Sequence, residues 1–363
     1  MSGARGKSPG PPDQVGFCRS SDGVRIAYAI HGNGPPLVVN SCWLSHLQHD
    51  WESPVWRHFL DELGQLATVI RYDERGFGLS DWDAEDFTLE ARVADLEAVV
   101  EAAGLDRFAL LGMAQGGPVA ITYTHRHPAR VSRLILWGTY CVGARDAENL
   151  EMQDTFSQMI RVGWARPDAM FRRFFTNLMI PGATEEQMCW IDDLQRHSTS
   201  TEALLAARAE RVKTDVTGVL GEIDVPTLVL HSRREQMIDF SEARALASSI
   251  PGARLVVLDS ANHILLADEP AWAVFQNEVA GFLAPERPAV PEAVAPLVES
   301  LTDRERDVLR LAAEGLDNPA IAERLTLSPR TVERHLSNAY LKLGVSGKVA
   351  RAAAVAHLFR DRH

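Results

Sequence analysis

The chain has 363 residues, enough for two or three domains, and its 46% hydrophobic and 24% charged residues are typical of a globular protein. No apolar run approaches the ~18 residues of a membrane span, and the Gly- and Pro-rich start is unlike a secretory signal. We therefore expect no membrane partner and a disordered tail over residues 1–15. Four scattered cysteines argue against disulfides and a zinc site and favour the cytoplasm. We expect neither a metal ion nor a cofactor.

The net charge of −12 is unevenly spread along the chain. Residues 300–363 carry eleven Lys and Arg against eight Asp and Glu, so their net charge is +3 and the remainder carries −15. A mildly basic module on an acidic body is compatible with DNA binding, because contacts to phosphates are local.

Short apolar runs alternate with longer helical patterns between about residues 24 and 284. Several of the runs are continuous and β-branched, which is typical of strands buried on both faces of a sheet. Helical stretches such as Leu89–Ala103 lie between them. This order predicts an α/β fold with a mainly parallel, doubly wound sheet. The expected strands are Arg25–Ala29, Leu37–Asn40, Thr68–Tyr72, Phe108–Gly112, Leu134–Trp137, Thr227–His231 and Leu255–Leu258.

The alternation stops in residues 141–221, which contain no convincing strand. This segment is rich in methionine and aromatic residues, among them Trp164 and Phe175. We expect it to form a helical lid over the functional face of the core, where soft thioethers suit apolar ligands of varied shape. The core itself is expected to comprise residues 16–140 and 222–284.

A turn with an unexpected central residue follows the fourth expected strand. Gly112, Gly116 and Gly117 are the small residues that let a strand turn sharply into a helix. In the motif G-x-S-x-G such a turn carries a nucleophilic serine, but here the central residue is Ala114. A methyl group cannot attack a carbonyl, so acyl-enzyme chemistry at this position is excluded.

Two further motifs accompany this turn. Residues Tyr72–Ser80 contain D-x-R-G-x-G-x-S, and Trp43–His46 precede Asp50–Pro54. Together with the turn they resemble the α/β-hydrolase family over residues 16–284, and the Trp43–Pro54 region resembles a subgroup that is fused to bacterial regulators.

The resemblance implies a site with the chain order nucleophile, acid, histidine. The three positions are then Ala114, Glu235 and His263, with Glu235 where the family more often has aspartate. The implied oxyanion donors are the backbone N–H groups of Gln115 and Trp43. Residues expected to contact a ligand through apolar surface are Met113, Trp164 and Phe175.

Residues 300–363 follow a Pro-rich linker, residues 285–299, and show the signals of three short helices. The first begins with the capping box Thr302–Glu305, the second follows Asn318-Pro319, and the third is capped by Ser328. The third has core residues at helical spacing, namely Val332, Leu336, Ala339 and Leu343.

These residues resemble the LuxR-type helix-turn-helix, which implies binding to double-stranded DNA. The outward residues expected to reach base edges are Arg330, Thr331, Arg334 and Asn338, and those expected at phosphates are Lys342 and Lys348. LuxR-type modules read paired half-sites as dimers, so we expect a homodimer.

Three hypotheses follow for the function. The first is a bacterial transcription regulator whose hydrolase-like domain senses a small apolar ester- or lactone-like molecule. The second is a serine esterase or lactonase of which this chain is an inactive Ser-to-Ala variant at Ala114. In the third, Glu235 and His263 abstract a proton from a bound substrate without any nucleophile.

Overall fold

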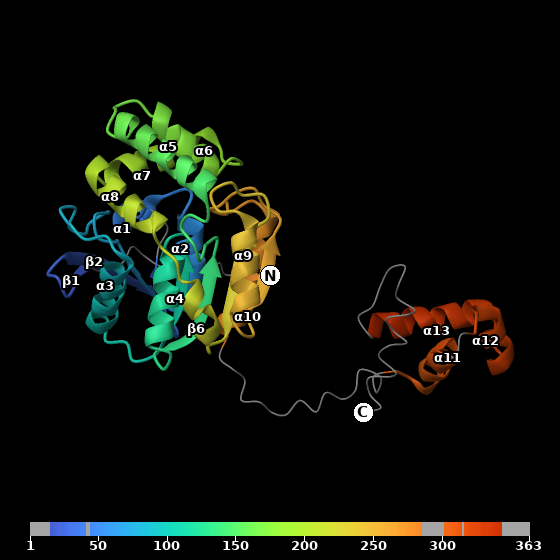
Figure 1. Cartoon of the computed structure of the whole chain (residues 1–363). Helices are drawn as coiled ribbons and strands as arrows, with labels where there is room; N and C mark the ends of the chain where they lie inside the picture. The colour runs from blue at the N-terminus through green and yellow to red at the C-terminus, as the bar shows by residue number, and fades with distance from the viewer. Residues whose placement is uncertain (1–14, 41–43, 285–300, 314–315, 343–363) are drawn as a thin grey trace, which may run out of the picture. The chain divides into compact units, whose positions relative to one another are not determined.

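The computed structural model divides into two compact units, Met1–Ala284 and Pro285–His363 (Figure 1). Each unit has its own apolar core. In the described part of the chain, no helix combines the length and the apolar character that crossing a membrane requires. The structure describes residues 15–40, 44–284, 301–313 and 316–342.

The first unit is built on an eight-stranded sheet with the order β1-β2-β4-β3-β5-β6-β7-β8. Strand β2 pairs antiparallel with both β1 and β4, and the five other strand pairs of the sheet are parallel, so the predicted mainly parallel α/β fold is confirmed. The strands are β1 (Val15–Arg19), β2 (Arg25–Gly32), β3 (Pro36–Asn40), β4 (Thr68–Tyr72), β5 (Phe108–Met113), β6 (Val131–Trp137), β7 (Thr227–Ser232) and β8 (Arg254–Leu258).

All seven expected strands are present, but β1 was not predicted. It lies at the edge of the sheet and is only partly buried, so it lacks the continuous apolar run that identified the others. Its first residue, Val15, also falls within the tail that was expected to be disordered. The remainder of that tail lies outside the described residues.

Helices cover both faces of the sheet. On one face, α3 (Leu89–Ala102), α4 (Gly116–Arg126) and α9 (Phe240–Ser249) contribute to one apolar core. On the other face, α1 (Leu47–Glu52), α2 (Arg57–Leu66) and α10 (Pro270–Leu283) contribute to a second core, which also contains side chains from the helices inserted between β6 and β7.

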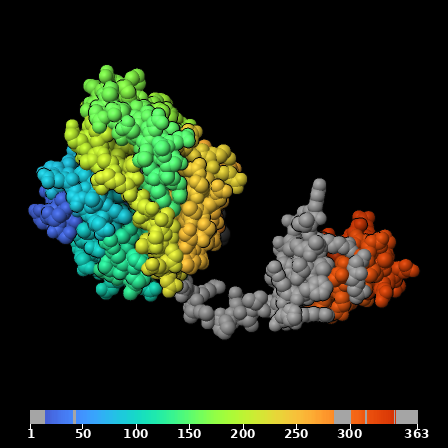
Figure 2. Space-filling model, viewed as in Figure 1, coloured from blue at the N-terminus to red at the C-terminus, as the bar shows by residue number. Residues whose placement is uncertain are grey.

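The insertion consists of four α-helices and a returning 3₁₀ turn. Its elements are α5 (Ala147–Gly163), α6 (Met170–Met179), α7 (Glu185–Ser198), α8 (Thr201–Val212) and η1 (Thr217–Glu222). Figure 1 shows α5–α8 gathered at one end of the sheet, and in the space-filling view their green and yellow-green side chains form that end of the unit (Figure 2).

In its described residues the second unit holds three helices, α11 (Asp303–Ala313), α12 (Asn318–Leu325) and α13 (Pro329–Lys342). The predicted capping box is confirmed, because the Glu305 N–H donates to Thr302 Oγ1 while the Thr302 N–H donates to Glu305 Oε2. The predicted core face of α13 is confirmed at Val332, Leu336 and Ala339, which are buried. Leu343, also expected there, lies outside the described residues.

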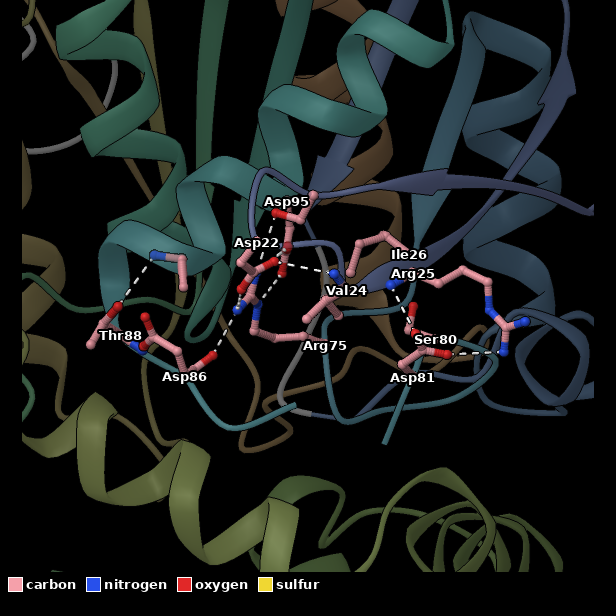
Figure 3. A network of polar contacts seen from close by, with 12 residues as sticks. Asp22, Val24, Arg25, Ile26, Arg75, Ser80, Asp81, Asp86, Thr88 and Asp95 are labelled. Carbon is pink, nitrogen blue, oxygen red and sulfur yellow. Dashed lines mark hydrogen bonds and ion pairs between the residues drawn. The ribbon is translucent and has the colours of Figure 1, made fainter. Parts of the chain in front are cut away.

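A buried arginine ties the start of the sheet to α3 (Figure 3). Arg75 donates to both carboxylate oxygens of Asp95, at 2.8 and 2.7 Å. It also donates to Asp22 in the β1–β2 turn, to Ser20 and to the carbonyl of Asp86. The side chains of Arg75 and Asp95 are each only 1% exposed, so neither charge has water as an alternative partner.

We predict that Asp95→Ala lowers the free energy of unfolding by about 3 kcal/mol, because it leaves part of a buried guanidinium unpaired. The matched control is Glu101→Ala, which removes a surface pair with Arg130 whose carboxylate side chain is 69% exposed. That change should lower the free energy of unfolding by less than about 1 kcal/mol. Urea unfolding of the full chain measures the stability of the two variants. An equal loss of unfolding free energy in both would contradict the structural role given to Asp95.

Candidate ligand-binding and nucleic-acid sites

The turn from β5 into α4 holds Ala114 in the left-handed region, with φ of 48°. In the described part of the chain, Thr326 is the one other non-glycine residue with positive φ. An alanine in this region is strained by about 1–2 kcal/mol. The surrounding structure therefore maintains the backbone of a nucleophile elbow although the side chain is a methyl group.

Close backbone approach explains the small residues around the turn. A Cβ atom on Gly112 would lie 2.8 Å from the Cα atom of Gly117, and one on Gly117 would lie 1.9 Å from Thr139 Oγ1. The Thr139 hydroxyl in turn donates to the carbonyl of Ala114, and the Ala114 N–H donates to the carbonyl of Trp137 at 3.2 Å. Strands β5 and β6 thus fix the elbow together.

The acid and the histidine expected from the sequence lie together. The Nδ1 atom of His263 is 2.9 Å from Glu235 Oε2, and both side chains are 1% exposed. Glu235 follows β7, and its Oε2 also accepts the N–H groups of Met237 and Ile238. A carboxylate held by two amides in this way is oriented to bind one nitrogen of the imidazole ring.

A second histidine, which the sequence analysis missed, lies against the same carboxylate. His231, the fifth residue of β7, has its Nε2 atom 3.1 Å from Glu235 Oε1 and 3.1 Å from the carbonyl of Ile238. Burial lowers its pKa, which favours the neutral ring. The signal was present in the sequence as a polar residue at the end of an apolar strand. Within the described ranges, no group of three or more His, Cys, Asp or Glu is arranged to hold a metal ion.

The inserted helices hold the loop that carries His263. The carbonyl of Met179, the last residue of α6, accepts the N–H of His263 at 2.8 Å. The side-chain oxygen of Asn262 accepts the N–H of Gly182 at 2.9 Å. A displacement of α6 would therefore move the histidine.

A buried ion network connects the inserted helices to the elbow from another side. Glu74 pairs with Arg92 of α3 and with Arg211 of α8, each at 2.9 Å. Burial opposes ionisation of Glu74, but the two guanidinium groups bring its pKa below the usual range. Arg92 also donates to the backbone carbonyl of Gln115, the residue after Ala114, at 2.8 Å.

Most of the other residues expected around the ligand are buried near the elbow, and one lies outside the described residues. Gln115 is buried directly after the turn, whereas Trp43 lies outside the described residues. Met113, Trp164 and Phe175 are buried in the same core as Ala114. Trp164 and Phe175 pack edge to face with ring centroids 6.3 Å apart, so part of their surface is already occupied by each other.

Helix α13 presents the expected polar face. Arg330, Arg334 and Asn338 are exposed, so they are free to approach a DNA groove. Thr331 is half-buried, and its hydroxyl lies 2.8 Å from the Ser328 hydroxyl that caps the helix. Lys348 lies outside the described residues.

Lys342, which we expect at a phosphate, also makes a contact within the module. Its Nζ atom donates to Glu305 Oε2 at 2.6 Å, and the Glu305 side chain is only 5% exposed. Burial opposes ionisation of this carboxyl, but the bonds from Lys342 and Thr302 bring its pKa below the usual value. The lysine therefore joins α13 to α11, a contact between distant residues that no sequence pattern revealed.

A mainly parallel sheet with a strained elbow and a buried acid–histidine pair defines the class as the α/β hydrolase fold. The chain belongs to that family, whose model matches residues 35–270. It is 27% identical over 263 residues to AB hydrolase superfamily protein YisY of Bacillus subtilis, covering 68% of this chain and 91% of that protein. An esterase structure from Exiguobacterium antarcticum has a TM-score of 0.66 at 22% identity, covering 75% of this chain and 100% of that one.

The model of bacterial regulatory proteins of the luxR family matches residues 299–355. Fifty residues of the chain are 58% identical to a candidate HTH-type transcriptional regulator, Mb0914c, of Mycobacterium bovis. This match covers 14% of this chain and 6% of that protein. The predicted combination is confirmed: an α/β hydrolase domain is joined to a LuxR-type DNA-binding module, as in a transcription regulator with a hydrolase-like domain.

We predict that Ala114→Gly is nearly neutral for stability, because relief of about 1–2 kcal/mol of backbone strain offsets the lost methyl contacts and the added chain entropy. The control is Ala206→Gly at an exposed position within α8, which should lower the free energy of unfolding by about 1 kcal/mol. Urea denaturation of both variants measures this difference. An equal loss at the two positions would show that Ala114 is not strained.

We also predict that Lys342→Met and Arg334→Ala separate folding from DNA binding. Lys342→Met leaves the buried Glu305 carboxylate without its cation. It should therefore lower the free energy of unfolding of the helix-turn-helix module by about 1 kcal/mol. Arg334→Ala, at an exposed position, should change stability by less than about 0.5 kcal/mol. Hydrogen exchange of the α11 and α13 amides measures both, and faster exchange in Arg334→Ala than in Lys342→Met would contradict this assignment.

Proposed function

We propose that this protein is a ligand-responsive transcription regulator. Its hydrolase-like domain binds a small apolar molecule, with esters and lactones as the candidate class, and its LuxR-type module binds DNA in response. The observation that carries the proposal is Ala114, because the strained elbow and the Glu235–His263 pair are maintained around a side chain that cannot attack a carbonyl. Such a site retains the features that bind a carbonyl compound and lacks the one that cleaves it.

In this proposal the residues have distinct roles. The backbone N–H groups of Gln115 and Trp43 bind the carbonyl oxygen of the ligand. Met113, Trp164 and Phe175 provide apolar contacts. The residues proposed to reach base edges are Arg330, Thr331, Arg334 and Asn338, and Lys348 contacts a phosphate. Lys342 can reach a phosphate only by sharing its charge with Glu305.

Ligand binding would change DNA binding by shifting a pre-existing equilibrium. Displacing the inserted helices would move both contacts described above, the Met179–His263 hydrogen bond and the Arg211–Glu74 pair. These contacts support a role for the inserted helices in transmitting the state of the site to the rest of the domain.

A gel shift with the full chain and DNA from upstream of its own gene tests the proposal. We expect a specific complex that Arg334→Ala weakens by about tenfold or more, since a side chain that reads a base edge contributes about 1–3 kcal/mol. Adding a series of esters and lactones should change the affinity for at least one of them. A full chain that binds this DNA with no preference over random DNA would contradict the regulator proposal.

We further propose a homodimer, because a module with a net charge of +3 gains specificity by reading two half-sites. The larger hydrolase-like body offers more apolar surface to share than the short helix-turn-helix, so we place the contact there. Light scattering on the full chain should give twice the chain mass, and a monomer at micromolar concentration would oppose this proposal.

A second candidate function is hydrolysis by a protein with serine at position 114. It is supported by the geometry of the elbow and by the buried Glu235–His263 pair, because both belong to the machinery with which a serine nucleophile is presented and activated. Proton abstraction by the Glu235–His263 pair without a nucleophile has no support beyond the pair itself.

Ala114→Ser distinguishes these functions. If the rest of the catalytic machinery is intact, this variant should hydrolyse p-nitrophenyl esters at least ~10³-fold faster than the present chain. The added variant His263→Ala should return the rate to that of the present chain, which excludes a contaminating esterase. A rate in Ala114→Ser equal to that of the present chain would mean that the site is no longer able to catalyse.

A further inference from the structure

Two helices of the insertion carry an exposed apolar face. In the described part of the chain, nine large hydrophobic side chains are exposed, and five of them lie on α5 and α6. The most exposed are Met170, at 68%, and Val162, at 61%. The other four are spread over β1, β2, the loop before α3 and α10. Apolar residues that are scattered singly are normal on a surface, whereas a cluster of them marks a contact site.

Helical spacing gathers the apolar residues on one side of each helix. We call them the α5–α6 face, which comprises Met152, Phe156, Met159 and Val162 of α5 and Met170 and Phe174 of α6. Within each helix they follow one another at intervals of three or four residues, so their side chains point the same way. The rings of Phe156 and Phe174 lie 5.9 Å apart, so the two rows meet. Figure 1 shows the two helices side by side at the end of the unit that the insertion forms.

The charges on α5 are arranged so that the helix complements a second copy of itself. The exposed carboxylates of Glu148, Glu151 and Asp154 lie in its first half, and the exposed Arg161 lies in its last turn. Glu151 and Arg161 are ten residues apart, so they project within about 80° of each other around the helix axis. If two copies of α5 lie antiparallel about a two-fold axis near Phe156, each Glu151 lies opposite Arg161 of the partner subunit. Such a two-fold contact closes after two copies.

The same charges disfavour a lipid surface, the other common occupant of an exposed apolar helix face. Helices that lie on membranes carry Lys and Arg beside their apolar side, because lipid headgroups of the cytoplasmic leaflet are anionic. Helix α5 carries three acidic side chains and one basic side chain, so its net charge is −2, and the whole chain carries −12. A second copy of the chain therefore fits this face better than a membrane.

The α5–α6 face adjoins the core around the elbow. Phe174 packs edge to face on Phe175, with ring centroids 5.5 Å apart, and Phe175 belongs to the same apolar core as Ala114. The last residue of the same helix, Met179, accepts the N–H of His263. A contact made by α6 is therefore made by the helix that holds the His263 loop.

We propose that the α5–α6 face is the homodimer contact of this protein, with a second copy of the chain packed on it antiparallel about a two-fold axis. The proposal rests on the proposed function, since it specifies how the regulator brings two DNA-binding modules together. A ligand that displaces α6 would then change the dimer contact together with the site.

Sedimentation velocity of the full chain over a range of micromolar concentrations tests the face. Val162→Glu places two carboxylates in the contact and should raise the dissociation constant of the dimer at least about hundredfold. Met170→Glu, on the other helix, should act in the same way. The matched control is Val274→Glu, which alters a valine of α10 that is 44% exposed and should leave the constant unchanged. Urea unfolding checks that all three variants fold, as expected for exposed positions.

A charge exchange tests the antiparallel arrangement. Arg161→Glu alone and Glu151→Arg alone each place like charges opposite one another and should weaken the dimer about threefold to tenfold. The double variant Glu151→Arg/Arg161→Glu restores opposite charges, so its dissociation constant should return to within about twofold of that of the unchanged chain. Weakening in the double variant equal to the sum of the two single effects would overturn the antiparallel arrangement.

A cross-link tests the position of the two-fold axis. Thr155 is exposed and directly precedes Phe156, so mild oxidation of Thr155→Cys should give a disulfide-linked dimer. The control is Ser249→Cys at an exposed position on α9, which should form no more linked dimer than the unchanged chain. Equal cross-linking of the two variants would contradict an axis at the middle of α5.

Three results would overturn the proposal as a whole. A dimer that persists unchanged in Val162→Glu and Met170→Glu would place the homodimer contact elsewhere. A monomer at every concentration would leave the face without a second copy. Binding of a monomeric chain to vesicles of phosphatidylcholine and phosphatidylglycerol, lost in Val162→Glu, would assign the face to a lipid surface.

The gel shift separates this proposal from the proposed function. A dimer that depends on Val162 but has no preference for its own upstream DNA would contradict the regulator and leave the dimer contact in place. Specific DNA binding that is equal in the unchanged chain and in Val162→Glu, with the dimer intact in both, would support the regulator and overturn the contact.

Discussion

The first unit depends on one strained turn, in which β5 reverses into α4 through a residue with positive φ. The turn can close because Gly112 and Gly117 have no side chain between the backbones of β5 and α4. The hydroxyl group of Thr139, which follows β6, then donates to the Ala114 carbonyl and holds the turn. Strain of this kind persists where the surrounding structure over-determines it. The sheet order, which places β6 beside β5, therefore determines the conformation of the site as well as its position.

The site is also connected to the inserted helices by polar contacts from two directions. Met179 holds the backbone of His263, and Arg211 reaches the elbow through Glu74 and Arg92. Charged groups buried this deeply are costly to separate, because a guanidinium or carboxylate without its partner cannot return to water. The inserted helices are therefore part of the same polar framework as the elbow.

Chemically, the site retains the elbow and the buried acid–histidine pair and lacks the nucleophile. In an enzyme, the binding energy of such a site is used to stabilise a transition state. In the regulator that we propose, no bond is broken, so the same contacts would serve only to stabilise a bound ligand. The LuxR-type module on the same polypeptide is the part of the chain that would respond to it in this proposal.

The sequence alone determined the class of fold, the elbow, the acid–histidine order and the helix-turn-helix, because each depends on local periodicity or on short motifs with fixed spacing. The edge strand β1 was missed because its exposure leaves no apolar run. Only the tertiary structure revealed His231 against Glu235 and the Lys342–Glu305 pair. Each of these depends on the distance between side chains from different turns or elements, and local patterns in a sequence do not encode such distances.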